Sequence, residues 1–446
     1  MAGIAGMARS HQRLGVERML DALKHRGPAG RAVLELESEN VTLGVVWTAS
    51  QAGLQRLLLE QKTARDSSGR GHLAEARAMD GGVALSRDAL GAAPLYAGWT
   101  EGNIFCFASE VKSLLEVTGQ VIEVPPGAAL DLQHFSSPVA PAPDPPLDDP
   151  PDKIAAEVLA KLDRAVKNGI GDGAAGCWLS GGLDPSVLCA LARPYVRVLH
   201  SFSVGMEGSP DLAFAREVAG VLKTEHHELV VDLPKLQDIM PDAICCLESF
   251  DARLVRSSLM NYLVGKLAAE FVPAVFSGEA SDELFAGYDY LNTIGVSGLP
   301  AELMDIQGRL HNTAFQRVDR CSAGHGLIAR LPFADPEVVR YGRRIPPGLL
   351  IKDGYAKWIL RYALRGRLPD GVLWRQKSKF WQGSGLNDLF ARIADGAISD
   401  REYHQEKTLP NGWTIGSKEE LMYYRIFRER FGELTALDWM GRTKDT

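Results

Sequence analysis

The fold is decided by the stretch Trp178-Leu179-Ser180-Gly181-Gly182-Leu183-Asp184-Pro185-Ser186. The apolar run 174–179 suits a short buried strand. Gly181 and Gly182 then allow a tight turn, and Asp184 stands where a following helix would have its N-cap. A strand, a glycine turn and a helix N-terminus form an anion site, because unpaired amide N–H groups and the helix dipole point to one place. The same residues also fit a capped strand-to-helix turn that binds no ligand.

Strands and helices alternate after this stretch. Residues 196–204 and 228–231 have the apolar character of strands, and residues 212–222 between them have helical spacing. This succession predicts a parallel sheet with helices on both faces. Ligands of such sheets bind at the carboxyl ends of the strands, where the strand order switches.

A second motif, Ser-Gly-Glu-Ala-Ser-Asp-Glu-Leu-Phe-Ala-Gly-Tyr, occupies residues 277–288. We expect a strand to end at Phe276 and a helix to begin near Ser281, so that Glu279 and Asp282 lie at another strand end. As helix caps, the two acids would contribute about 1 kcal/mol. Both acids could equally serve chemistry at the sheet edge.

Composition limits the classes of function. A chain of 446 residues with 46% hydrophobic and 24% charged residues predicts two or three soluble domains. The net charge of −7 argues against a nucleic-acid partner, and no apolar run reaches the about 18 residues that span a membrane. The start lacks the pattern of a secretory signal, and the six cysteines show no CxxC spacing. We therefore expect a cytoplasmic protein with buried thiols.

Seven prolines between residues 136 and 152 mark the best domain boundary, since such a stretch is extended and semi-rigid. We expect a domain over residues 1–135, a proline-rich linker over 136–153 and a second domain over 154–446.

The two motifs resemble the pyrophosphate loop and the Ser-Gly-Glu-Gly-Ala-Asp-Glu-Leu-Phe-Gly-Gly-Tyr motif of the asparagine synthetases, which belong to the N-type ATP pyrophosphatases. Pro185 departs from the loop, where the family usually has a hydroxyl residue. The resemblance implies an α/β fold in which a shortened Ntn-hydrolase-like α+β domain precedes an adenine-nucleotide α-hydrolase-like parallel-sheet domain with a helical C-terminal part.

The first third resembles the family's glutaminase domain in His25-Arg26-Gly27-Pro28, in Arg87-Asp88 followed by Pro94-Leu95-Tyr96, and in Phe107-Ala108-Ser109-Glu110. Ala2 replaces the cysteine with which the family releases ammonia from glutamine, and alanine has no nucleophilic atom. The family's glutamine-binding segments also have no counterpart before Leu85. These further losses favour a natural loss of glutaminase activity over an engineered Ala2.

The resemblance assigns roles to single residues. Glu279 would act on the incoming amine, Lys377 would stabilise charge during adenylation and amide formation, and Asp184 and Asp282 would hold Mg²⁺. ATP and its pyrophosphate would contact Leu179, Ser180, Gly181, Gly182, Asp184, Ser186, Val204, Ser277 and Gly278. Arg253 and Arg256 could clamp a substrate carboxylate or form a solvated helix face. Arg253 stands where the family has Thr, which weakens the case for aspartate as the acid.

The implied function is an AMP- and pyrophosphate-forming amide-bond synthetase that needs ATP and Mg²⁺ but lacks glutaminase activity. Its partners would be a small carboxylic acid and either ammonia or another amine, with a homodimer or an ammonia-supplying protein as further expectations. The alternatives are a specialised ligase of the lactam or peptide-macrocycle type, and a non-catalytic nucleotide-binding relative. Related β-lactam synthetases usually have Tyr at the position of Glu279, which favours an intermolecular reaction.

Overall fold

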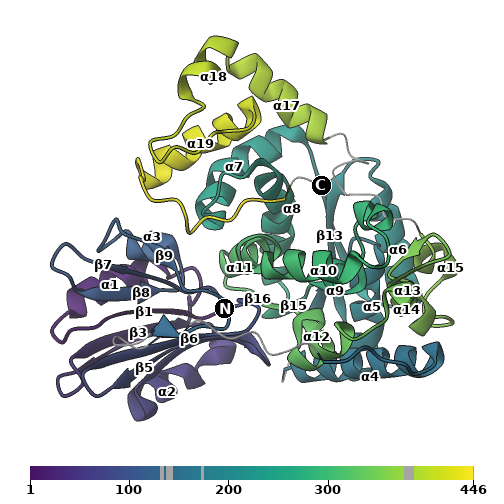
Figure 1. Ribbon diagram of the computed structural model, residues 1–446, viewed down its shortest axis with the longest axis horizontal. Coiled ribbons are helices and arrows are strands. Elements are labelled where there is room, and N and C mark those ends of the chain that lie inside the picture. The colour runs from purple at the N-terminus through teal and green to yellow at the C-terminus, as the bar shows by residue number, and fades with distance from the viewer. Residues whose placement is uncertain (131–134, 137–143, 172–174, 376–385, 445–446) are drawn as a thin grey trace.

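The computed structural model describes residues 1–130, 135–136, 144–171, 175–375 and 386–444 (Figure 1). Its N-terminal part contains two antiparallel sheets, and its larger part is a parallel sheet surrounded by helices. The first methionine lies near the middle of the molecule, between these two parts (Figure 1).

The two N-terminal sheets pack face to face. One has the order β2-β3-β1-β8-β7-β9 and the other the order β11-β10-β6-β5-β4. The first contains β1 (Gly3–Met7), β2 (Gly30–Leu36), β3 (Val41–Trp47), β7 (Tyr96–Trp99), β8 (Phe105–Ala108) and β9 (Ile122–Glu123). The second contains β4 (Thr63–Gly69), β5 (His72–Met79), β6 (Gly82–Arg87), β10 (Ala129–Leu130) and β11 (Phe135–Ser136). Side chains of both sheets, such as Ile4, Leu43, Leu85 and Phe107, share one buried core.

Three short helices accompany these sheets: α1 (Arg13–Ala22), α2 (Gly53–Gln61) and α3 (Val111–Leu114). Helix α1 buries Val16, Met19 and Leu20, the positions that recur on one face at helical spacing. These residues belong to a second core, which also contains residues from the C-terminal helices.

The parallel sheet confirms the expected α/β class. Its order is β14-β13-β12-β15-β16, and every pairing in it is parallel. The strands are β12 (Ala175–Trp178), β13 (His200–Met206), β14 (Glu225–Val231), β15 (Ala274–Phe276) and β16 (Ile328–Arg330). The chain runs outward from β12 through β13 to β14 and then returns to the other side of β12. The switch in strand order therefore lies between β12 and β15, where the carboxyl ends of both strands are available to a ligand.

Helices cover both faces of this sheet (Figure 1). They are α4 (Pro151–Gly169), α5 (Leu183–Ala192), α6 (Pro210–Leu222), α7 (Leu233–Leu247), α8 (Ala252–Ala269), α9 (Ser281–Phe285), α10 (Leu299–Gly308) and α11 (Ala314–Ala323). The remainder are α12 (Pro336–Gly342), α13 (Pro347–Leu350), α14 (Trp358–Ala363), α15 (Asp370–Leu373), α17 (Leu386–Ala397), α18 (Asp400–Glu406) and α19 (Lys418–Phe431), with the hairpin β17 (Ile351–Lys352) and β18 (Tyr355–Ala356). Helices α17, α18 and α19 form a separate group beside α7 (Figure 1).

Two local expectations need correction. Helix α5 begins at Leu183 with Gly182 as its N-cap, so Asp184 lies within the first turn and is not the cap. Helix α4 begins at Pro151, inside the stretch expected to be a linker, because proline is well suited to the first position of a helix. Within the same stretch, residues 144–147 lie along α12: Asp144 pairs with Arg340 at 2.7 Å, and the Leu147 amide donates to the Arg344 carbonyl at 2.8 Å.

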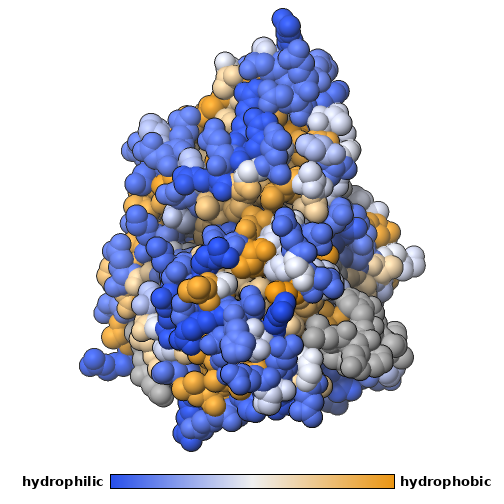
Figure 2. Space-filling model, turned by 90° about the vertical axis from the view of Figure 1, so that its left-hand side faces the viewer, coloured by the Kyte–Doolittle hydropathy of each residue, from blue (hydrophilic) through white to orange (hydrophobic). Residues whose placement is uncertain are grey.

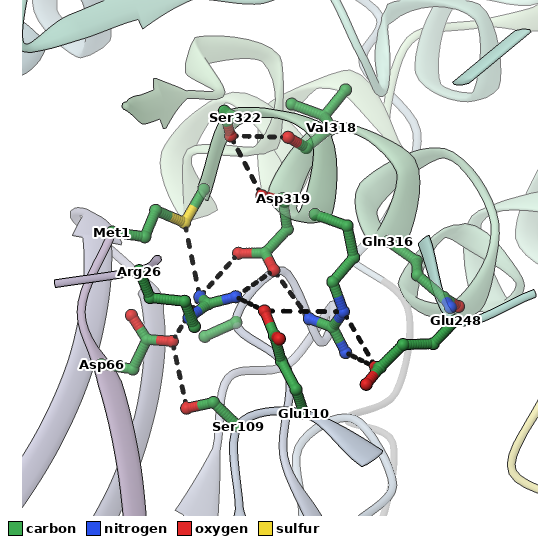
Figure 3. Close-up of polar contacts among 12 residues, drawn as sticks. Met1, Arg26, Asp66, Ser109, Glu110, Glu248, Gln316, Val318, Asp319 and Ser322 are labelled. Carbon is green, nitrogen blue, oxygen red and sulfur yellow. Dashed lines mark hydrogen bonds and ion pairs between the residues drawn. The ribbon is translucent and has the colours of Figure 1, made fainter. Parts of the chain in front are cut away.

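A buried polar cluster joins the N-terminal sheets to α11 (Figure 3). The guanidinium of Arg26 donates to Glu110 at 2.8 Å, to Asp66 at 2.8 Å and to Asp319 of α11 at 2.7 Å. Its Nε also donates to the carbonyl oxygen of Ala2 at 2.7 Å. Next to it, Arg320 of α11 pairs with Glu248 at 3.0 Å.

Every charged side chain of this cluster is almost completely inaccessible to water. Burial raises the pKa of Asp66 to about 6, although Arg26 acts to lower it. Arg26 and Arg320, together with Lys112 beside Glu110 and Glu248, therefore balance the charge of the buried carboxylates at the junction.

The surface is largely polar. The face drawn in Figure 2 is mostly hydrophilic, with apolar residues visible in patches across its middle. Among the described residues, no helix has the length and hydropathy needed to cross a membrane.

Candidate active site

The glycine turn lies between β12 and α5, at the carboxyl edge of the parallel sheet. Gly181 has a φ of +70°, and a Cβ placed on it would lie 2.5 Å from the Cβ of Phe214. Only glycine meets both conditions, the left-handed backbone and the close approach of α6. The turn directs Ser180 and Gly182 toward a cavity of about 930 Å³.

Pro185 is compatible with the helix that follows. It is the third helical residue of α5, where a backbone N–H has no partner within the helix, so its absence breaks no hydrogen bond. The next residue, Ser186, is fully buried, and its hydroxyl donates to the Gly182 carbonyl at 2.7 Å. Ser186 therefore stabilises the turn from the side that faces away from the cavity.

The cavity brings together most of the residues predicted to bind nucleotide. Those that line it are Leu179, Ser180, Gly182, Asp184, Val204, Ser277 and Gly278, whereas Gly181 and Ser186 do not. Their meeting follows from the sheet order, because Leu179 follows β12 and Ser277 follows β15, its neighbour. A Cβ on Gly278 would lie 2.8 Å from the Cβ of Asp184, so the two loops touch.

Asp184 and Asp282 face one buried lysine, Lys357. Its Nζ lies 2.5 Å from Asp184 Oδ2 and 2.7 Å from Asp282 Oδ1. Only 4% of Lys357 is exposed, and the two carboxylates, against the effect of burial, raise the pKa of its ammonium group. The sequence prediction assigned no role in the site to Lys357, which stands at the N-cap of α14, far along the chain.

The paired carboxylates are suitable ligands for Mg²⁺. Both line the cavity and remain partly exposed, and both offer the hard oxygen atoms that Mg²⁺ prefers. The second oxygen of Asp184, Oδ1, accepts a hydrogen bond from Ser281 Oγ at 2.8 Å, which fixes its orientation. Because Mg²⁺ is commonly held by one or two carboxylates together with substrate phosphates, the residues present fit the ion.

The backbone around these carboxylates is strained. Ala280, Ala286 and Lys357 have φ values of 74°, 57° and 55°. In the family motif quoted above, glycine stands at the positions of Ala280 and Ala286. A left-handed alanine costs about 1–2 kcal/mol relative to the usual helical conformation. Such strain is typical of sites where function requires a particular backbone geometry.

Glu279 is held by Arg317 of α11. The Nη2 of Arg317 lies 2.6 Å from Glu279 Oε1, and its Nη1 donates to Ser257 Oγ at 2.9 Å. Burial acts to lower the pKa of Arg317, but the charge of Glu279 raises it, so the guanidinium keeps its charge. The sequence prediction did not find Arg317, because nothing in its local pattern distinguishes it from an ordinary helical arginine.

A second acid, Glu283, lies in the same wall of the cavity and accepts a hydrogen bond from the Tyr288 hydroxyl. Burial, and secondly the charge of Asp282, raises the pKa of Glu283 to about 7. The two acids of this wall therefore differ in their surroundings. Asp282 is paired with Lys357, whereas Glu283 has a pKa near neutral pH and can carry a proton there.

Arg253 and Arg256 both line the cavity from α8, one turn apart. Arg256 pairs with the buried Glu419 at 2.9 Å, and Arg253 donates to the Lys444 carbonyl at 2.7 Å. Each guanidinium thus has a protein partner, and their use as a carboxylate clamp remains a prediction.

At the opposite end of the cavity, Arg375 reaches the glycine turn. It donates to Asp211 at 2.7 Å, and its guanidinium lies 3.9 Å from the centre of the Phe214 ring. This arrangement places a positive charge beside the loop predicted to bind phosphate. Lys377, predicted to stabilise charge during the reaction, lies outside the described residues.

Known proteins resemble this chain over most of its length. The family model for asparagine synthase matches residues 157–305 and 301–442. Asparagine synthetase B [glutamine-hydrolyzing] of Escherichia coli (strain K12) is 33% identical over 373 residues, 78% of this chain and 67% of that protein. The probable asparagine synthetase [glutamine-hydrolyzing] of Schizosaccharomyces pombe (strain 972 / ATCC 24843) is 31% identical over 409 residues, 81% of this chain and 72% of that protein.

A solved structure, that of NMN synthetase from Francisella tularensis, aligns with 65% of this chain and 98% of its own. With a TM-score of 0.29 and 14% identity, it carries no argument here.

A parallel sheet with a glycine turn and paired carboxylates at its switch point defines an ATP-binding α/β enzyme, and the relatives make it an ATP-dependent C–N ligase. The chain belongs to the asparagine synthase family.

Proposed function

We propose that the protein joins a small carboxylic acid to ammonia or another amine, with cleavage of ATP to AMP and pyrophosphate. The observation that carries this proposal is the meeting of Asp184, Asp282 and Glu279 in one cavity with the glycine turn. The acid carboxylate would attack the α-phosphorus of ATP and form an acyl-adenylate, which the amine would then convert to the amide.

The phosphate end of the cavity would bind the triphosphate. The amides around Ser180 and Gly182 and the N-terminus of α5 favour anionic oxygens, and Arg375 adds a positive charge nearby. Asp184 and Asp282 would hold Mg²⁺, which would neutralise charge on the phosphate oxygens. Lys357 would hold the two carboxylates in place, and Lys377 is the proposed stabiliser of charge on the α-phosphate.

The other end would bind the amine. Glu279, oriented by Arg317, would accept a hydrogen bond from the amine and direct its lone pair toward the acyl carbon. Because Arg317 already binds one carboxylate oxygen of Glu279, we infer that Glu279 orients the amine more than it removes its proton.

We further propose that glutamine is not the source of the amine. Ala2 is completely buried, and its carbonyl oxygen is bound by Arg26, so no nucleophile stands at this position. The amine would therefore reach the synthetase cavity as a free molecule.

The proposal is tested by exchange of labelled pyrophosphate into ATP with a panel of carboxylic acids that includes aspartate. We expect exchange with at least one acid, AMP as the nucleotide product in the complete reaction, and no glutamate when glutamine replaces ammonia. Stoichiometric ADP would contradict the proposed reaction, and released glutamate would contradict the loss of glutaminase activity. ATP binding without exchange for any acid would instead support the non-catalytic relative.

The variant Glu279→Gln should affect the two half-reactions, adenylation of the acid and formation of the amide, to different extents. We expect pyrophosphate exchange to stay within about threefold of the parent, because Glu279 does not contact the phosphate site. Amide formation should fall by ~100-fold, the scale on which a misplaced reactant slows a reaction. Rapid-quench measurement of amide product checks this, with Glu270→Gln on the exposed end of α8 as the matched control. An equal loss in both half-reactions would remove the assigned role.

A further inference from the structure

Three potential metal ligands gather at the amino end of two neighbouring parallel strands. His200 is the first residue of β13, Glu225 is the first residue of β14, and the two are paired directly in register. His227 follows Glu225 by two residues, so its side chain lies on the same face of the sheet. Strand β14 is an edge strand, which leaves Glu225 accessible to water with 60% of its side chain exposed.

The ligand atoms lie close to the spacing of a tetrahedral metal site. Nδ1 of His200 lies 3.0 Å from Nε2 of His227 and 3.6 Å from Oε2 of Glu225, and all three atoms lie within 4.8 Å of one another. Zinc bonds of about 2.0–2.2 Å at tetrahedral angles separate neighbouring ligand atoms by about 3.3–3.6 Å. The three atoms could therefore bind one ion with small side-chain movements.

The surroundings hold the two imidazoles in place. The ring of His227 packs against two aromatic rings, with its centre 3.9 Å from that of Phe271 and 5.0 Å from that of Phe202. Two neutral imidazoles at this distance can also share one N–H···N hydrogen bond without any metal. This hydrogen bond is the competing explanation for the 3.0 Å contact between His200 and His227.

We propose that His200, Glu225 and His227 form a binding site for a divalent transition metal, with zinc as the ion that two imidazoles and one carboxylate suit best. Water would occupy the fourth position, on the exposed side of Glu225. The site lies at the amino ends of the strands, whereas the nucleotide loops follow their carboxyl ends. It is therefore independent of the proposed function and would tie the edge strand β14 to β13.

The test is a zinc titration of the full chain in competition with a chromophoric chelator, with millimolar Mg²⁺ present to occupy the carboxylates of the active site. We expect one equivalent of zinc with a Kd in the micromolar range or below. His227→Ala should weaken binding by more than ~100-fold, since losing even a residue that supports a ligand costs about 10–100-fold. Co²⁺ in place of zinc should give the intense visible absorption of a tetrahedral site.

His226→Ala is the matched control. His226 neighbours His227 on the same strand, but it lies on the opposite face, where its Nδ1 is 2.8 Å from Ser201 Oγ. This variant should bind zinc like the parent. Glu225→Gln provides a second variant at an exposed position and should weaken binding without affecting the fold. A parent that binds no zinc below about 100 μM, or equal binding by the parent, Glu225→Gln and His227→Ala, would overturn the proposal.

Discussion

Replacing either Asp184 or Asp282 by asparagine is expected to lower pyrophosphate exchange by ~100-fold or more. Each substitution keeps the shape of the side chain but removes a charge that faces the cavity. It also leaves Lys357 with one carboxylate partner, so the buried ammonium would compete for the remaining ligand of Mg²⁺. The loss of a metal ligand and the loss of a counter-charge to Lys357 therefore both lower pyrophosphate exchange.

The measurement is exchange activity as a function of Mg²⁺ concentration, combined with thermal unfolding of each variant. Asp163→Asn is the control, because Asp163 is a half-buried residue of α4, outside the cavity, that accepts a hydrogen bond from Tyr195. It should leave exchange unchanged. If Asp184→Asn and Asp282→Asn both exchange within threefold of the parent, these residues do not hold the metal.

Replacing Arg26 by methionine should destabilise the protein by about 3–5 kcal/mol, the usual cost of leaving buried charges without their partner. Glu110, Asp66 and Asp319 would all lose a hydrogen-bonded counter-charge inside the protein. Chemical denaturation, followed by fluorescence and by circular dichroism, would measure the change in the free energy of unfolding. Arg31→Met is the matched control, because Arg31 pairs with Asp21 on the surface and should change stability by at most about 1 kcal/mol.

The loss of folding stability caused by Arg26→Met should depend on pH. Asp66 already has a pKa of about 6 in the folded protein because of burial, and removing Arg26 would raise it further. An acid whose pKa is raised by folding binds more protons in the folded state, so the variant should lose stability as pH rises from about 4 through the folded pKa. A penalty that is the same at pH 5 and pH 8 would show that charge is not its cause.

The sequence predicted the parts of the site that follow directly from strand ends. Asp184 and Asp282 were placed correctly in space because each comes just after a strand, and neighbouring parallel strands present their carboxyl ends together. Gly181 was explained by its turn, and its left-handed φ agrees with that reasoning. The local start of α5 was wrong by two residues, since several polar residues in a row can serve as the cap.

Residues that reach the site from other helices were not predictable in this way. Lys357 and Arg317 are separated from the motifs by long stretches of chain, and only tertiary packing brings them to Asp282 and Glu279. Their sequence surroundings are those of ordinary helix ends and amphipathic faces. Ser186, predicted to contact the nucleotide, does not line the cavity, and its hydroxyl bonds to the Gly182 carbonyl; its contact with a nucleotide stays a prediction.

The buried polar cluster between the N-terminal sheets and α11 has a consequence for how the protein unfolds. Helix α11 carries Arg317, which is bound to Glu279. It also carries Asp319, which pairs with Arg26, and Arg320, which donates to the hydroxyl of Tyr96 in β7 at 3.4 Å. If the sheets detached first, these buried charges would be exposed together with part of the core that α1 shares with α7 and α8. Calorimetry should accordingly record one cooperative melting transition for the whole chain, with no intermediate in which the synthetase half survives alone.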